Sequence, residues 1–97
     1  MAAYMLVDVQ VHDPVRYQAY MAAVPRLIAR HGGEYLVRGG AAEVLEGPRE
    51  PGRLVVFRFP NRQAIHDFVN DPEYQPLKAL RQSVATASIV AVDGVDG

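Results

Sequence analysis

Residues 31–40, His-Gly-Gly-Glu-Tyr-Leu-Val-Arg-Gly-Gly, decide how this chain folds. The residues before them have the three- and four-residue spacing of apolar side chains that is typical of an amphipathic helix. The first glycine pair predicts a left-handed residue, Gly32 or Gly33, that ends this helix. Residues 34–38 then form a strand, and the second glycine pair predicts a bulge or bend. The chain therefore turns twice within this short stretch.

The rest of the chain predicts three further strands and a second helical region. The first helix begins at Asp13-Pro14 and continues through Pro25, which kinks it because proline removes a helical hydrogen bond. The second helical region begins at the Asn61 cap and restarts at Asp71-Pro72, since a residue before proline avoids the helical conformation. Apolar alternation predicts strands at residues 4–11, 34–38, 53–59 and 86–93, with extended chain resuming at 42–46.

The element order is therefore β-α-β-β-α-β, which predicts an α+β domain of the ferredoxin-like type with both helical regions on one face of an antiparallel sheet. One domain is expected over residues 1–97, with an ordered core of about 4–93 and a frayed tail at residues 93–97. Right-handed crossovers place the strand at 4–11 beside the strand at 53–59.

The second face of the predicted sheet mixes apolar and charged side chains. Leu6, Leu54 and Val56 alternate there with Asp8 and Arg58. Because a soluble monomer seldom exposes such a patch, we expect a second copy to cover it face to face, which predicts a homodimer. Asp8 and Arg58 lie on neighbouring strands with matching parity, and we expect them to form an ion pair inside this dimer.

The composition excludes several classes of function. The chain has 97 residues, a formal net charge of -1 and no cysteine. The charge gives no reason to expect nucleic acid or an anionic membrane as a partner, and no apolar run approaches the roughly 20 residues of a membrane span. The missing cysteines remove disulfides and thiolate chemistry. With no signal-peptide pattern near Met1, a cytoplasmic location is expected.

A resemblance to a known family covers nearly the whole chain. It rests on residues 31–40, on Glu-Val-Leu-Glu-Gly at 43–47, on Pro60, on the segment 71–78 and on Arg81. These residues resemble the signature of the domain-of-unknown-function family 1330. The resemblance implies a dimeric α/β barrel, in a superfamily that includes cofactor-independent monooxygenases of antibiotic biosynthesis, muconolactone isomerases and haem-dependent members. The family itself implies no established activity.

Two residues of the opening stretch are candidates for catalysis. His31 lies in the last turn of the first helix, where it caps the helix or lies at the surface, or else acts as a general acid or base at a pocket mouth. Arg38 ends a strand beside glycines. It either forms a cross-strand ion pair or clamps a ligand carboxylate, since bare glycine backbone permits close approach.

Four further residues are candidates for substrate binding. Tyr35 and Tyr74 either orient a ligand through their hydroxyl groups or are tyrosines at the edge of the core. Asp8 and Arg58 either form only an ion pair with each other or also contact the substrate. His66 lies one residue from the apolar Ile65, and we expect it to be exposed.

Other chemistries lack support in the sequence. The three histidines lack the spacing of metal ligands, and nothing points to a haem beyond an axial role open to His31. The strand at 53–59 lacks the glycine–aromatic spacing of RNA-binding sheets, and Gly39-Gly40 is not a phosphate loop. The leading hypothesis is an enzyme without cofactor that acts on a small organic acid or aromatic metabolite. The alternative is a non-catalytic dimeric module that binds a small ligand or a protein.

Overall fold

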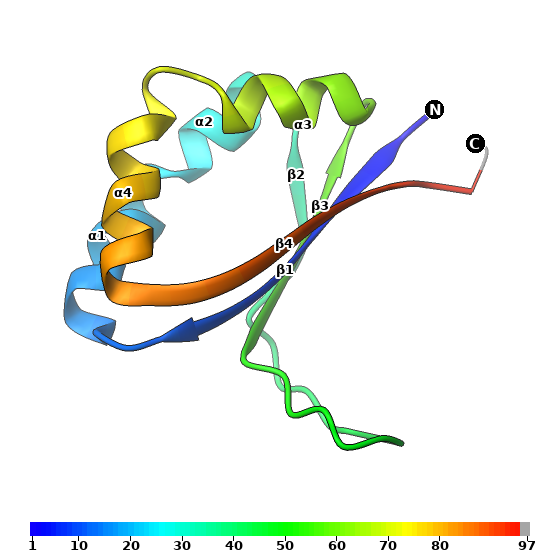
Figure 1. Cartoon of the computed structure of the whole chain (residues 1–97). Coiled ribbons are helices and arrows are strands. Elements are labelled where there is room, and N and C mark those ends of the chain that lie inside the picture. Colours follow the sequence, from blue (N-terminus) through cyan, green and yellow to red (C-terminus); the bar gives the residue numbers. More distant parts are fainter. Residues whose placement is uncertain (96–97) are drawn as a thin grey trace.

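A four-stranded antiparallel sheet covered by helices on one face makes up the computed structural model, which describes residues 1–95 (Figure 1). The strand order is β2-β3-β1-β4. This confirms the predicted α+β, ferredoxin-like fold and the pairing of the first strand with the third. In chain order the elements are β1 (Ala3–Val11), α1 (Pro14–Ala23), α2 (Pro25–Arg30), β2 (Glu34–Arg38), β3 (Arg53–Phe59), α3 (Arg62–Val69), α4 (Tyr74–Val84) and β4 (Ala85–Asp93).

β1 is central to the sheet, because it pairs with β3 on one side and β4 on the other. Its alternation sends Met5 and Val9 into the core, as predicted. The inner side chains of β3 are Val55, Phe57 and Phe59, and all three are buried. Both strands therefore present one continuous apolar face to the helices.

The predicted single kinked helix is wrong in detail, because the structure has two helices there. α1 ends at Ala23 and α2 begins at Pro25. Pro25 has no N–H to offer the Met21 carbonyl, while the Val24 N–H still reaches the Tyr20 carbonyl at 3.0 Å. The loss of one bond in the ladder is enough to separate the two helices.

Gly32 makes the predicted left-handed turn, with φ of 78°, and β2 follows over the predicted residues. Gly39 also has positive φ, which confirms a bend at the second glycine pair. The extended segment expected at 42–46 is wrong. Within the described chain no strand lies between β2 and β3, and Figure 1 shows this connection extending away from the body of the domain.

The second helical region follows the prediction closely. The Asn61 side chain accepts a hydrogen bond from the Ala64 N–H at 2.8 Å and caps α3. Asp71 accepts from the Glu73 N–H at 2.9 Å, but α4 begins at Tyr74 rather than Pro72. No helix in residues 1–95 is long and apolar enough to cross a membrane.

The end of the chain is more ordered than a frayed tail after residue 93 would be. The Gly94 N–H donates to the Ala2 carbonyl at 2.9 Å, next to the last pair of the β1–β4 ladder. The expected tail also includes residues 96 and 97, which lie outside the described residues.

Gly33 provides a test of how tightly the turn packs on the sheet. It lacks the positive φ of Gly32, but a Cβ at Gly33 would lie 2.7 Å from the Phe59 ring and 2.8 Å from Ile28. We expect Gly33→Ala to cost about 1–3 kcal/mol of unfolding free energy through overpacking. Gly40→Ala is the control, because a Cβ there has no described atom within 4 Å. Urea unfolding of both variants checks this, and equal stability of the two would contradict it.

Candidate functional site

A cavity of about 350 Å³ lies between the inner face of the sheet and the helices. Its walls include Met5 and Phe57 from the sheet and Ile28, Ile65 and Phe68 from the helices. This volume falls in the range of small-molecule sites, whose walls are likewise mostly apolar. The interior of the domain is therefore not completely filled by its own side chains.

The polar groups of this cavity are phenols and cations. Four tyrosines line it, namely Tyr17, Tyr20, Tyr35 and Tyr74. Four cationic side chains and one histidine also line it, namely Arg38, Arg53, Lys78, Arg81 and His66. No aspartate or glutamate of residues 1–95 is among the lining residues. The cavity is therefore positively charged and suited to an anion.

A β-bulge aims Arg38 into the cavity. Tyr35 is opposite the inward Phe57, but the register shifts at the next residue, so that Arg38 is opposite the inward Val55. Without this extra residue, Arg38 would point to the outer face of the sheet. Its guanidinium carbon instead lies 4.4 Å from the centre of the Tyr35 ring, a cation–π contact. Tyr35 and Arg38 are thus brought together as candidates.

Tyr20, Tyr74 and Arg81 form a buried polar cluster in the helical layer. The two hydroxyl oxygens lie 2.9 Å apart, and Tyr74 and Arg81 are 2% and 7% exposed. Burial, with Tyr74 adding to it, raises the pKa of Tyr20, so this phenol stays protonated at neutral pH. Burial disfavours the Arg81 charge, but the Tyr74 and Tyr20 hydroxyls raise its pKa, so the guanidinium stays charged.

The guanidinium group of Arg53 lies near the Tyr17 hydroxyl. Burial raises the pKa of Tyr17, and the nearby Arg53 acts against this shift. Gly39 leaves room for Arg53, because a Cβ there would overlap its guanidinium. The Nε atoms of Arg53 and Arg81 are both buried without a hydrogen-bond partner among the described residues. Both guanidinium groups therefore have a buried donor that no described residue satisfies.

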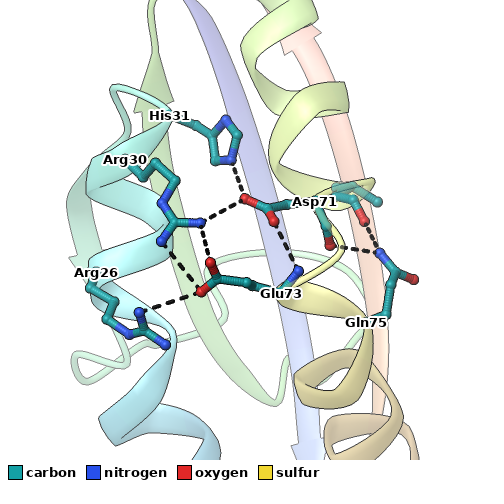
Figure 2. A network of polar contacts seen from close by, with 7 residues as sticks. Arg26, Arg30, His31, Asp71, Glu73 and Gln75 are labelled. Atoms are coloured by element: carbon teal, nitrogen blue, oxygen red, sulfur yellow. Dashed lines mark hydrogen bonds and ion pairs between the residues drawn. The ribbon is translucent and has the colours of Figure 1, made fainter.

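His31 does not line this cavity, whereas Arg38 does. His31 ends α2 as its cap, as the structural interpretation predicted, and its Nε2 lies 2.8 Å from Asp71 Oδ2 (Figure 2). Its ring also packs against Phe68, with the ring centres 6.2 Å apart. His31 thus contacts the cavity only through a wall residue.

Asp71 is the centre of a polar network that joins α2 to the α3–α4 connection (Figure 2). Arg30 donates to Asp71 at 3.3 Å and lies 3.1 Å from Glu73, which Arg26 also contacts at 3.5 Å. The hydrogen bond from His31, with the Glu73 N–H second, lowers the pKa of Asp71. The network holds the helical layer together behind the cavity.

The predicted ion pair between Asp8 and Arg58 is wrong. Asp8 is opposite Leu54 in the β1–β3 ladder, whereas Arg58 is opposite Tyr4, about 13 Å further along the strand. Asp8 instead pairs with Arg49 and accepts from the Gly52 N–H at 2.8 Å. Arg58 lies 3.6 Å from Glu34 on β2. Neither Asp8 nor Arg58 lines the cavity, since both belong to the outer face.

Sequence reasoning missed several cavity residues, Arg81 above all. The buried residues of α4 are Tyr74, Arg81 and Val84, which lie at helical spacing on one face. An arginine on an otherwise apolar helix face is the signal that could have found it. Arg53 carries no such signal, because its approach to Gly39 depends on how the two strand ends meet. His66 is exposed, as predicted, but it still lines the cavity.

No metal site accompanies this cavity in the described part of the chain. Residues 1–95 contain no group of three or more histidine, cysteine, aspartate or glutamate side chains that could hold an ion. The polar side chains that this site offers for chemistry belong to tyrosine, arginine, lysine and histidine residues.

Comparison with known proteins places this α+β fold in a class of ferredoxin-like proteins. The chain belongs to the family described as "Domain of unknown function (DUF1330)", whose model matches residues 2–95. The predicted family is thereby confirmed. Among curated proteins no match was found.

Solved structures show the same fold at low identity. A protein of unknown function from Rhodopseudomonas palustris aligns with a TM-score of 0.82 and 18% identity, covering 99% of this chain and 84% of that one. SnoaB, a cofactor-independent oxygenase from Streptomyces nogalater, aligns at 0.65 and 14%, covering 99% and 95%. A protein from Jannaschia sp., described as dimeric and ferredoxin-like, aligns at 0.72 and 14%, covering 97% and 100%.

The Asp71 network predicts how stability depends on pH. Because the pKa of Asp71 is lower in the folded chain than its unfolded value of about 4, its charge stabilises the fold above that value. This contribution is lost as the pH falls below about 4. We expect Asp71→Asn to be less stable than the wild type at about pH 5, with the difference shrinking by about pH 3.

Urea unfolding at the two pH values measures this difference. Asp67→Asn is the control, because Asp67 is an exposed acid on α3 whose side chain accepts only from Gln63 among the described residues. A difference between Asp71→Asn and the wild type that stays constant from about pH 5 to about pH 3 would contradict the proposed linkage.

Proposed function

We propose that this protein binds a small organic acid or aromatic metabolite in the cavity and acts on it without a bound cofactor. The observation that carries the proposal is a cavity of about 350 Å³ with aromatic walls, four cations and no acidic lining residue in residues 1–95. A filled apolar interior would instead have favoured a module without ligand chemistry. The similarity to SnoaB, described as a cofactor-independent oxygenase, supports an enzyme of this kind.

Each polar lining residue has a role in this proposal. Arg38 binds the anionic group of the ligand. Tyr35, whose ring lies against the Arg38 guanidinium, orients the ligand. Tyr74 and Tyr20 share one hydrogen bond between their hydroxyls, which leaves one O–H of the pair to donate to the ligand. His66 is the histidine that lines the cavity, so it replaces His31 as the group that transfers a proton. His31 becomes a positioning residue that supports Phe68.

A non-catalytic binding module is the second candidate. It is favoured by the lack of a catalytic base with a fixed position. No carboxylate of the described chain lines the cavity, and His66, the histidine that does, is exposed. Both candidates require a ligand in the cavity. Turnover of a bound metabolite, which His66→Gln should abolish without lowering affinity, separates the enzyme from the module.

Arg38→Ala tests the ligand clamp. Loss of a charge-assisted contact of roughly 1.5–3 kcal/mol should lower the affinity for benzoate by about ten- to a hundredfold. The melting temperature should fall only slightly, because Arg38 is exposed and the variant loses only an exposed cation–π contact with Tyr35, worth about 0.5–1 kcal/mol. Calorimetric titration and thermal unfolding measure the two effects. A variant that melts much lower but binds equally well would contradict the clamp.

We also propose that two copies associate through the outer face of the sheet and so form a dimeric α/β barrel. Leu6, Val37, Val90 and Val92 are between 40% and 52% exposed. Pairing of Leu6 with Val90 and of Tyr4 with Val92 sets these side chains on one face of the sheet, away from the helices. A patch of this kind is uncommon on a monomer. The dimeric protein from Jannaschia sp. supports the same assembly.

Val56→Glu tests this assembly, because Val56 is opposite Leu6 at the centre of the outer face. A carboxylate desolvated there should shift the chain to monomer at micromolar concentration. Val15→Glu on α1 is the control, since Val15 is 78% exposed. Sedimentation velocity measures the mass, and a wild type that sediments as a 10.7 kDa monomer would contradict the dimer.

A further inference from the structure

The cations of the cavity come from both of its layers. Arg38 ends β2 and Arg53 begins β3, so both belong to the sheet. Lys78 and Arg81 belong to α4, in the helical layer. All four line the same cavity, and in residues 1–95 no acidic side chain lines it with them. A ligand between the layers therefore meets positive charge on two sides.

Arg81 is the best-built anion contact in the helical layer. Its side chain is 7% exposed, and its Nε has no hydrogen-bond partner among the described residues. The Tyr20 and Tyr74 hydroxyls neighbour the guanidinium, and no carboxylate of residues 1–95 forms an ion pair with it. A buried cation without an opposite charge is costly, and an anion bound in the cavity would remove most of that cost.

The sheet layer provides a separate contact. Arg53 has a second buried and unpartnered Nε within the described chain, and its guanidinium passes over Gly39. Arg38 lies beside it, turned inward by the bulge in β2. The Tyr17 hydroxyl interacts with the charges of both Arg53 and Arg81, so the two contacts lie within electrostatic reach of one phenol. Because Arg38, Arg53 and Arg81 line one cavity of about 350 Å³, a single small ligand in that cavity can meet both contacts.

We infer that the ligand is a small aromatic dianion, with one anionic group held by Arg81 and the other by Arg38 and Arg53. This inference rests on the proposed function and narrows its substrate class. Two guanidinium contacts on opposite layers match two carboxylate or equivalent groups. The aromatic body between them would lie against Tyr35, Phe57 and Phe68, which line the same cavity.

Calorimetric titration of the whole chain with matched probes tests the inference. The probes are benzoate, the three benzenedicarboxylate isomers and neutral benzamide. We expect at least one dicarboxylate to bind about tenfold or more tightly than benzoate, and benzamide to bind most weakly. Increasing salt should weaken the dicarboxylate more than benzoate.

Three variants assign the two contacts. Arg81→Met and Arg38→Met should each lower the affinity for the preferred dicarboxylate by about tenfold or more, to the level of benzoate. Arg38 is exposed, so Arg38→Met remains informative if Arg81→Met fails to fold. Arg16→Gln is the control, because Arg16 is an exposed cation on α1 that does not line the cavity. Its affinity should equal that of the wild type.

Each result has a distinct meaning. A dicarboxylate advantage that Arg38→Met removes supports the dianion. Benzoate binding as tightly as every dicarboxylate overturns the dianion but leaves the proposed function standing. Tightest binding of benzamide overturns the anionic ligand altogether. No binding of any probe overturns both the dianion and the proposed small-ligand site.

Discussion

The pairing of β1 with both β3 and β4 is the constraint on which the rest of this structure depends. It places the first strand of the chain between β3 and the last strand, β4, which forms one edge of the sheet. Because side chains alternate along β1, one face of that sheet is apolar and lies beneath the helices. The other face stays open and mixed in character. The cavity and the proposed dimer surface are thus two faces of the same sheet.

The cavity adjoins the two clusters of buried apolar side chains that hold the helices on the sheet. One core cluster includes Phe59, Phe68 and Leu27, and a second includes Val9 and Val84. Aromatic residues of the clusters, such as Phe68, line the cavity together with four long cationic side chains. Cations can line such a space because their stems are apolar and their charged ends can bind what enters. These cationic side chains leave the cavity open to an anion, whereas apolar side chains in the same positions could pack closely and fill it.

The sequence predicted the fold well because its signals are local. Asn61 and Gly32 took the capping roles that their positions indicated, and β2 and β3 have the predicted bounds. The errors concern features that depend on tertiary contacts. The register of β1 against β3 separates Asp8 from Arg58. Alternation along each strand predicts that the two side chains share a face, but it does not predict how far apart they lie along that face. The segment at 42–46 resembled a strand but has no partner strand in the described chain.

The candidate site was predicted only in part, for a related reason. Tyr35, Arg38 and Tyr74 do line the cavity. Arg38 does so because of a bulge that resets the parity of β2, a feature that alternation along the sequence cannot reveal. Of the two roles open to His31, the structure shows the helix cap: its side chain contacts Asp71, since the α3–α4 connection lies beside the end of α2. Arg81 was overlooked although it interrupts an apolar helix face.

The central claim is that the space between sheet and helices is the ligand site. The most direct measurement is a titration of the isotope-labelled protein with benzoate, followed through its side-chain methyl NMR signals. We expect the largest shifts at methyl groups that line the cavity, those of Met5, Val55 and Ile89, while the methyl groups of Leu6 and Val90 on the outer face stay unchanged. Shifts confined to the outer face, or none at saturating benzoate, would contradict it.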